Sequence, residues 1–194
     1  MIEYFENILK VISDSLKKLD VESFETLQKE MEETLRKGKK IIVSGLGKNV
    51  PICEKFVGTM QSLGMDAAFL HTNSAVHGDL GNVHSGDLVI ILTKSGATAE
   101  SIYLSKFIKK KNANLWLMTF EENSVLGKTV DKKLVISMAH EGDLWNIVPN
   151  NSTTIYLIVL QALAIITAEK MGITIEQFKE NHPGGHIGEI LSGK

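Results

Sequence analysis

Thr93-Lys-Ser-Gly-Ala-Thr-Ala-Glu100 is the stretch that decides the fold of this 194-residue chain. It follows residues 87–92, a short and almost wholly apolar segment that indicates a buried strand. It precedes residues 101–110, where apolar side chains recur at helical spacing. The stretch is therefore predicted to be a turn between a strand and an amphipathic helix. Its hydroxyl groups, its glycine and the helix N-terminus together suit a phosphate or another anion. A hydroxyl N-cap on an ordinary loop would give the same pattern.

Strands and helices alternate along the rest of the chain. Further strands are predicted over residues 40–44, 66–70, 114–119 and 131–136, and further helices over 1–18, 21–37, 51–63, 151–171 and 174–178. The strands are continuously apolar rather than alternating, which indicates a parallel sheet covered on both faces. We expect one α/β domain over residues 1–194. Two N-terminal helices (1–37) would precede a three-layer αβα sandwich with a five-stranded parallel sheet (38–194).

Composition restricts the class of protein. Apolar residues make up 43% of the chain and charged residues 23%, as in soluble globular proteins. A net charge of −2 gives no electrostatic reason to expect nucleic acid or a membrane as partner, and no helix-turn-helix segment is evident. The single cysteine, Cys53, excludes an internal disulfide and suits a reducing compartment. Residues 1–6 lack the pattern of a signal peptide, so a cytoplasmic location is expected.

The longest apolar run, residues 155–168, is too short to span a bilayer comfortably. It indicates a helix buried on most sides, whose outer face a second subunit would cover.

Topology is expected to gather the polar segments of the chain. Ligands of parallel sheets bind beyond the carboxyl ends of the strands. A polar residue or segment follows each of four predicted strands: Lys48, residues 71–81, residues 93–100 and Glu141. We therefore expect all four at one edge of the sheet.

Five motifs occur in a characteristic order. They are Gly45-Leu-Gly-Lys48, Ala75-Val-His-Gly-Asp-Leu-Gly81, Ser95-Gly96-x-Thr98-x-Glu100, Ser152-Thr-Thr154 and His182-Pro-Gly-Gly185. Together they resemble the sugar isomerase (SIS) domain of arabinose-5-phosphate isomerases, over roughly residues 35–192. The resemblance implies a flavodoxin-like fold and interconversion of D-arabinose 5-phosphate and D-ribulose 5-phosphate through an enediol. It also implies a homotetramer with active sites between subunits, and no metal or organic cofactor.

The resemblance assigns site residues position by position. The residues matching its catalytic set are Lys48, Glu100, Glu141 and His182. The residues matching its substrate- and phosphate-binding positions are Ser44, Gly45, His77, Thr93, Ser95, Gly96 and Thr98. Taken alone, these residues also suit ordinary roles, such as a solvated lysine or a carboxylate near a helix N-terminus.

The reaction suggests a role for each residue of the catalytic set. Lys48 would hold a sugar hydroxyl or polarise the developing enediolate, and Glu100 would act as acid, base or orienting group. Glu141 would exchange the C1/C2 proton, provided that burial raises its pKa. His182 would open the sugar ring in a neighbouring subunit's site, with Pro-Gly-Gly exposing its imidazole. Exchanged roles for Glu141 and His182 fit equally well.

The sequence departs from the family at several positions, which leaves the exact substrate open. Lys94 stands where the family often has asparagine, and residues 49–51 and 142–149 carry other side chains. Many members continue into a pair of CBS modules, whereas this sequence ends at Lys194, so regulation through such modules is not expected. Isomerisation of a hexulose 6-phosphate and a non-catalytic sugar-phosphate sensor remain alternatives. An isomerase would exchange solvent deuterium into C1 or C2, and a sensor would not.

Other polar and aromatic residues receive weaker assignments. His71, His77 and His84 lack the spacing of a zinc site, although His77 could contact substrate or an inhibitory metal. Trp145 would line the sugar pocket or a subunit contact. The product would serve lipopolysaccharide or capsule synthesis, or belong to sugar uptake.

Overall fold

The structure is a computed structural model that describes residues 1–191. It contains one sheet of five parallel strands in the order β2-β1-β3-β4-β5. The strands are β1 (Ile41–Gly45), β2 (Ala67–His71), β3 (Leu88–Leu92), β4 (Asn114–Thr119) and β5 (Lys132–Val135). Every residue of β1 and β3 is buried, as expected for central strands that are covered on both faces.

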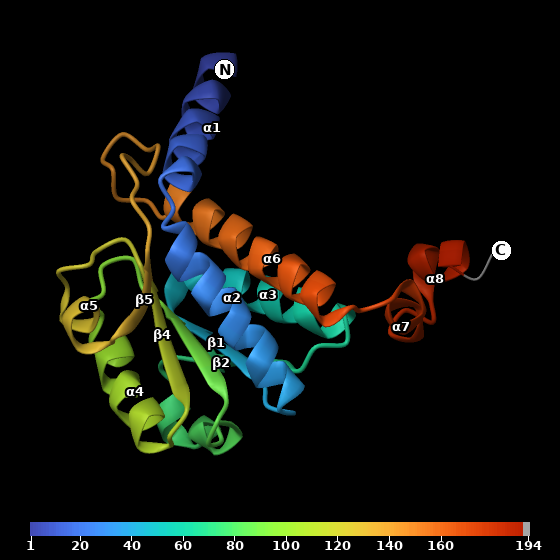
Figure 1. Cartoon of the computed structure of the whole chain (residues 1–194). Coiled ribbons are helices and arrows are strands. Elements are labelled where there is room, and N and C mark those ends of the chain that lie inside the picture. Colours follow the sequence, from blue (N-terminus) through green and yellow to red (C-terminus); the bar gives the residue numbers. More distant parts are fainter. Residues whose placement is uncertain (192–194) are drawn as a thin grey trace.

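Helices cover both faces of the sheet (Figure 1). The long helices are α1 (Ile2–Lys17), α2 (Val21–Arg36), α3 (Val50–Ser62), α4 (Ala99–Lys110) and α6 (Asn151–Met171). One apolar cluster joins α2, α3 and α6 to side chains such as Val43 and Ile90. The other joins α4 and the short α5 (Val125–Thr129) to alternate side chains such as Ile42 and Val89. This alternation along each strand separates the two layers of the core.

The helix α6 is the apolar run that the sequence singled out. Ten of its residues, from Asn151 to Ala168, are buried against the sheet and its neighbouring helices. By length and composition α6 could cross a membrane, but most of it lies inside the fold, as core helices do. Ile158 and Ile165 remain partly exposed on its outer face. The expectation of a helix buried on most sides is confirmed.

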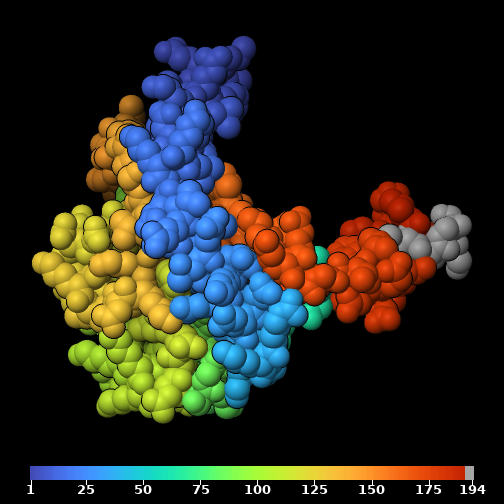
Figure 2. Space-filling model, in the orientation of Figure 1, coloured from blue at the N-terminus to red at the C-terminus, as the bar shows by residue number. Residues whose placement is uncertain are grey.

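Both ends of the described chain extend away from the central body. The C-terminal half of α1 packs on the core through Ile12, whereas its N-terminal half projects beyond the sheet and its covering helices (Figures 1 and 2). That projecting half exposes apolar side chains, namely Ile2, Tyr4, Phe5 and Leu9. At the other end, α7 (Ile175–Glu180) and α8 (Gly185–Leu191) stand apart from the sheet.

A second exposed apolar segment lies beside α1. In the loop before α6, the side chains of Leu144 and Trp145 are 92% and 70% exposed. The Tyr4 hydroxyl donates to the Gly142 carbonyl at 3.3 Å, which joins this loop to α1. We call the exposed apolar side chains of these two neighbouring segments the α1–loop surface.

The predicted elements are confirmed with shifts of a few residues at their ends, and so is the α/β fold. As predicted, Asp20 caps α2, and its carboxylate accepts from the backbone N–H of Ser23. The prediction missed α5 and α8. The single turn of α5 is too short for a periodic pattern, and it is fixed by Ser124, whose hydroxyl accepts from the Gly127 N–H.

Candidate active site

The first part of the site forms where β1 and β2 end. Ser44, near the end of β1, is fully buried, and its hydroxyl lies 2.9 Å from the hydroxyl of Thr72, which follows β2. At Gly45, an added Cβ would lie 2.9 Å from the Cβ of Asn49 and 3.0 Å from the Sγ of Cys53. The glycine therefore lets the chain turn tightly from β1 into the segment that carries Lys48.

The Thr93–Thr98 loop is built between β3 and α4 and is held by neighbouring backbone. Its Lys94 carbonyl accepts from the Phe120 N–H at 3.1 Å, and its Gly96 carbonyl accepts from the Leu126 N–H at 3.0 Å. Gly96 has φ +59°, and an added Cβ there would overlap the side chain of Ser124. Only glycine suits this conformation and this close approach.

The loop carries three hydroxyl groups, those of Thr93, Ser95 and Thr98. The hydroxyls of Thr93 and Thr98 lie 3.2 Å apart, and the exposed Ser95 accepts from the Ala97 N–H at 3.3 Å. Thr98 is the N-cap residue of α4, yet its side chain makes no capping hydrogen bond. The ordinary interpretation, a hydroxyl N-cap, is therefore wrong for Thr98. The first-turn N–H groups of α4 have no side-chain cap, which suits binding of an anion.

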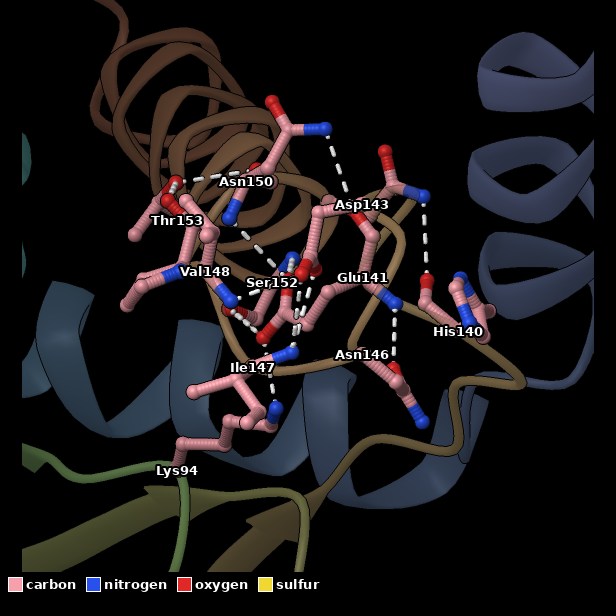
Figure 3. Close-up of polar contacts among 12 residues, drawn as sticks. Lys94, His140, Glu141, Asp143, Asn146, Ile147, Val148, Asn150, Ser152 and Thr153 are labelled. Carbon is pink, nitrogen blue, oxygen red and sulfur yellow. Dashed lines mark hydrogen bonds and ion pairs between the residues drawn. The ribbon is translucent and has the colours of Figure 1, made fainter.

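Glu141 lies beside this loop in a network of hydrogen bonds (Figure 3). Its Oε1 lies 2.6 Å from the Lys94 Nζ and accepts from the Ser152 hydroxyl at 2.6 Å. Its Oε2 accepts from the backbone N–H groups of Asn150 and Ser152 at 3.0 and 2.9 Å. The carboxylate thus caps the N-terminus of α6, and the helix dipole favours its negative charge.

The pKa of Glu141 differs from the expectation. Burial is the largest single influence and raises the pKa of this carboxyl, because it disfavours the charged form. Hydrogen bonds from Lys94, Ser152 and Asn150 act the other way and together lower the pKa below its usual value of 4.5. The expectation of a raised pKa is therefore wrong for the ligand-free protein, in which the Glu141 carboxylate accepts from four donors.

Three further predicted residues lie on exposed turns that follow strands. Lys48 is in the 3-10 turn Gly47–Asn49 after β1, and His77 is in the turn Ala75–His77 after β2. Glu100 is exposed in the first turn of α4. Within residues 1–191, none of the three has an ion-pair partner.

His182 lies elsewhere in the chain's own fold. Its Nε2 is 3.0 Å from the hydroxyl of Ser62, and its Nδ1 is 2.8 Å from the Phe178 carbonyl. The ring stacks on Phe178 with centroids 4.0 Å apart, so the expectation that Pro-Gly-Gly exposes the imidazole is wrong. Ser62 is the last residue of α3, and Lys48 lies just before its first residue. The 13 residues of this helix have a length of about 20 Å. The fold therefore does not bring His182 to the site of its own chain.

Sequence reasoning missed three partners in the site, namely Thr72, Lys94 and Asn150. Asn150 was identified only as a helix start, and its side chain makes no cap, since Glu141 takes that place. Lys94 lies inside the stretch that organises the fold, but nothing in a local pattern indicates a partner 47 residues away. Within the described residues, no group of three or more His, Cys, Asp or Glu side chains is arranged to hold a metal.

Comparisons with known proteins identify relatives of this chain. The SIS domain family matches residues 34–166. The arabinose 5-phosphate isomerase KdsD of Pseudomonas aeruginosa is 38% identical over 160 residues, which are 82% of this chain and 49% of the relative. KdsD of Yersinia pestis is 32% identical over 186 residues, 96% of this chain and 57% of the relative. The chain thus spans about half the length of these curated relatives.

A solved structure extends the likeness to nearly the whole chain. The c3406 protein of Escherichia coli CFT073, in complex with arabinose 5-phosphate, is 30% identical and superposes with a TM-score of 0.84. The match covers 93% of this chain and 94% of that one. The parallel sheet, the Thr93–Thr98 loop and these matches lead to one conclusion: the chain belongs to the SIS domain family.

Proposed function

We propose that this protein is an aldose–ketose isomerase that interconverts D-arabinose 5-phosphate and D-ribulose 5-phosphate through an enediol. The observation that carries the proposal is the Thr93–Thr98 loop, with its uncapped helix N-terminus, directly beside the buried carboxylate of Glu141. Relatives named arabinose 5-phosphate isomerase, and a relative of known structure bound to arabinose 5-phosphate, support this substrate.

The phosphate group of the sugar would bind at the Thr93–Thr98 loop. The hydroxyls of Thr93, Ser95 and Thr98 and the first N–H groups of α4 supply donors, and Ser44 supports the neighbouring loop. Gly45 and Gly96 permit the close approach of backbone that these turns need. A fixed phosphate would place C1 and C2 of the open-chain sugar at a constant distance from the loop.

Proton transfer needs groups around the reacting carbons. Glu141 lies beside the phosphate loop and would exchange the proton between C1 and C2. Lys48 would polarise the carbonyl oxygen, Glu100 would orient the sugar hydroxyls, and His77 would contact substrate at the mouth of the site. No metal or organic cofactor is part of the proposal.

The assembly would complete the site. His182 lies at the end of α3 that is far from Lys48, and a neighbouring subunit would bring its own His182 to the site instead to open the sugar ring. The exposed α1–loop surface, which includes Trp145, supports burial between subunits, because clustered exposed apolar side chains are a mark of protein–protein contacts. We propose a homotetramer, built from a single domain of residues 1–194, that acts in cytoplasmic carbohydrate metabolism and supplies lipopolysaccharide synthesis.

The test is turnover of D-arabinose 5-phosphate by the purified protein without added metal, in deuterated water. Formation of D-ribulose 5-phosphate with deuterium at C1 is expected, together with its loss in Glu141→Gln. In the reverse direction the deuterium would appear at C2 of D-arabinose 5-phosphate. The matched control Glu122→Gln changes an exposed carboxylate paired with Lys133 and keeps full activity. Tight binding of the sugar phosphate without any exchange would refute the enzyme and favour a sensor.

A further inference from the structure

Lys94 occupies a special place among the partners of Glu141. The other donors to this carboxylate, Asn150 and Ser152, lie at the start of α6, which directly follows the loop that contains Glu141. Lys94 comes instead from the Thr93–Thr98 loop, which is the proposed phosphate site. It is the only cation paired with Glu141 in residues 1–191. Its side chain is 43% exposed, whereas that of Glu141 is 0% exposed. A ligand therefore meets Lys94 before it meets Glu141.

The backbone and the side chain of Lys94 differ in freedom. Its carbonyl is fixed by the Phe120 N–H at 3.1 Å and the Thr119 hydroxyl at 3.2 Å. Its four-carbon side chain has only the Glu141 carboxylate as polar partner within the described residues. A lysine ammonium on such a flexible stem can change partners without moving the main chain.

We propose that Lys94 is a further substrate-binding residue, which covers Glu141 in the free enzyme and uncovers it by moving its ammonium to the phosphate group of the bound sugar. The inference rests on the proposed function, since it assigns the phosphate to the loop that Lys94 shares with Ser95. A phosphate dianion attracts the ammonium more strongly than a carboxylate that already accepts three other hydrogen bonds.

Glu141 would remain in place after Lys94 leaves. The Ser152 hydroxyl and two backbone N–H groups still hold both oxygens. Without the ammonium, one of the interactions that lower the pKa of Glu141 is lost, whereas burial still raises it. The pKa therefore rises, which makes the carboxylate a better proton acceptor. The low pKa of the free enzyme and a general-base role in the bound enzyme are then compatible.

The other ionisable groups around Glu141 do not replace Lys94. Tyr156 of α6 is buried, its hydroxyl donates to the Met118 carbonyl, and burial raises its pKa well above the usual value of 10.0. His140 precedes Glu141, and its Nδ1 accepts from the Gly142 N–H. Asp143 accepts from backbone N–H groups of its own loop, and Tyr4 of α1 donates to Gly142.

Calorimetry with D-arabinitol 5-phosphate tests the inference, because this ligand has no carbonyl to isomerise. Lys94→Met is expected to bind it at least about tenfold more weakly than wild type, since a charged hydrogen bond is lost. Glu141→Gln is expected to bind it as tightly or more tightly, because Lys94 is already free. Lys132→Met is the matched control: Lys132 forms a 2.7 Å ion pair with Glu30 at similar exposure, and its loss leaves affinity unchanged.

Proton uptake provides a second readout. Below neutral pH, the binding of wild type should show more proton uptake than that of Glu141→Gln in buffers of different ionisation enthalpy, because a fraction of Glu141 takes up a proton when Lys94 leaves. The phosphate group of the ligand titrates with a pKa of about 6 and contributes equally in all variants, so the difference from wild type should be the same for Glu141→Gln and Lys94→Met. If Lys94→Met fails to fold, Lys94→Gln keeps a donor to Glu141 without charge and carries the same expectations.

The outcomes separate this inference from the proposed function. If wild type turns over arabinose 5-phosphate but Lys94→Met keeps wild-type affinity or proton uptake, Lys94 is merely a structural partner of Glu141 and the inference is wrong. If wild type neither binds D-arabinitol 5-phosphate nor isomerises the sugar, the proposed function fails and this inference fails with it.

Discussion

Replacement of Glu141 by glutamine should destabilise the fold as well as stop the reaction. The carboxylate accepts four hydrogen bonds, from the Lys94 ammonium, the Ser152 hydroxyl and two backbone N–H groups at the start of α6. An amide has one acceptor oxygen and presents its NH2 group to donors. Removing one partner of a buried ion pair costs about 3–5 kcal/mol. Because Lys94 can turn to solvent, we expect the lower end of that range, about 3 kcal/mol at pH 7.

The loss should depend on pH with a defined sign. The pKa of Glu141 is lower in the folded protein than its usual 4.5, so its stabilisation is fully present above about pH 4.5. It disappears as pH falls from there through the lower folded pKa, because the protonated carboxyl resembles the amide. The free energies of unfolding of wild type and Glu141→Gln should therefore converge at acid pH.

Urea denaturation at fixed protein concentration measures this difference, because stability of an oligomer depends on concentration. Glu122→Gln is the control, since the Glu122–Lys133 pair is exposed and should contribute less than about 1 kcal/mol. A Glu141→Gln protein within about 1 kcal/mol of wild type at pH 7 would refute the network as a source of stability.

Three further predictions concern the loop, the assembly and the exposed surface. Gly96→Ala should lose about 1–3 kcal/mol of unfolding free energy in urea denaturation and bind sugar phosphate weakly, because φ is +59° and an added Cβ would overlap Ser124. Gly58→Ala, in open space on α3, is the control and should be neutral or slightly stabilising in the same assay. Mixing inactive Glu141→Gln and His182→Ala proteins under subunit exchange should restore part of the turnover, whereas no recovery would place both residues in one chain's site. Phe5→Asp on the exposed face of α1 should shift the mass measured by light scattering toward smaller species, and an unchanged mass would argue against this surface as an interface.

The fold was predictable because its signals are local. Buried parallel strands require continuous apolar runs; β3 is apolar at every position and β1 at its first three, and both strands are buried throughout. Helix boundaries follow from caps such as Asp20 and from apolar spacing. The missed α5 has only five residues, so its capping by Ser124 outweighs any periodic pattern.

The candidate site was predictable only as a collection of segments. Parallel topology requires the segments after β1, β2 and β3 to share one edge, and the hydroxyl pairs Ser44–Thr72 and Thr93–Thr98 lie at the ends of these strands, as the sequence predicts. The environment of each group could not be predicted in the same way. Whether burial or hydrogen bonding controls the pKa of Glu141 depends on donors from two separate segments.

The sequence by itself determined the order of elements, the parallel sheet and the glycine at position 96, because each depends on neighbours along the chain. Tertiary structure alone decided that Lys94 pairs with Glu141 and that His182 lies at the far end of α3. These facts arise from contacts between residues 47 and 120 positions apart, whose energies depend on distance and burial in space. The spacing of residues along the sequence gives neither the distance between two such residues in space nor their burial.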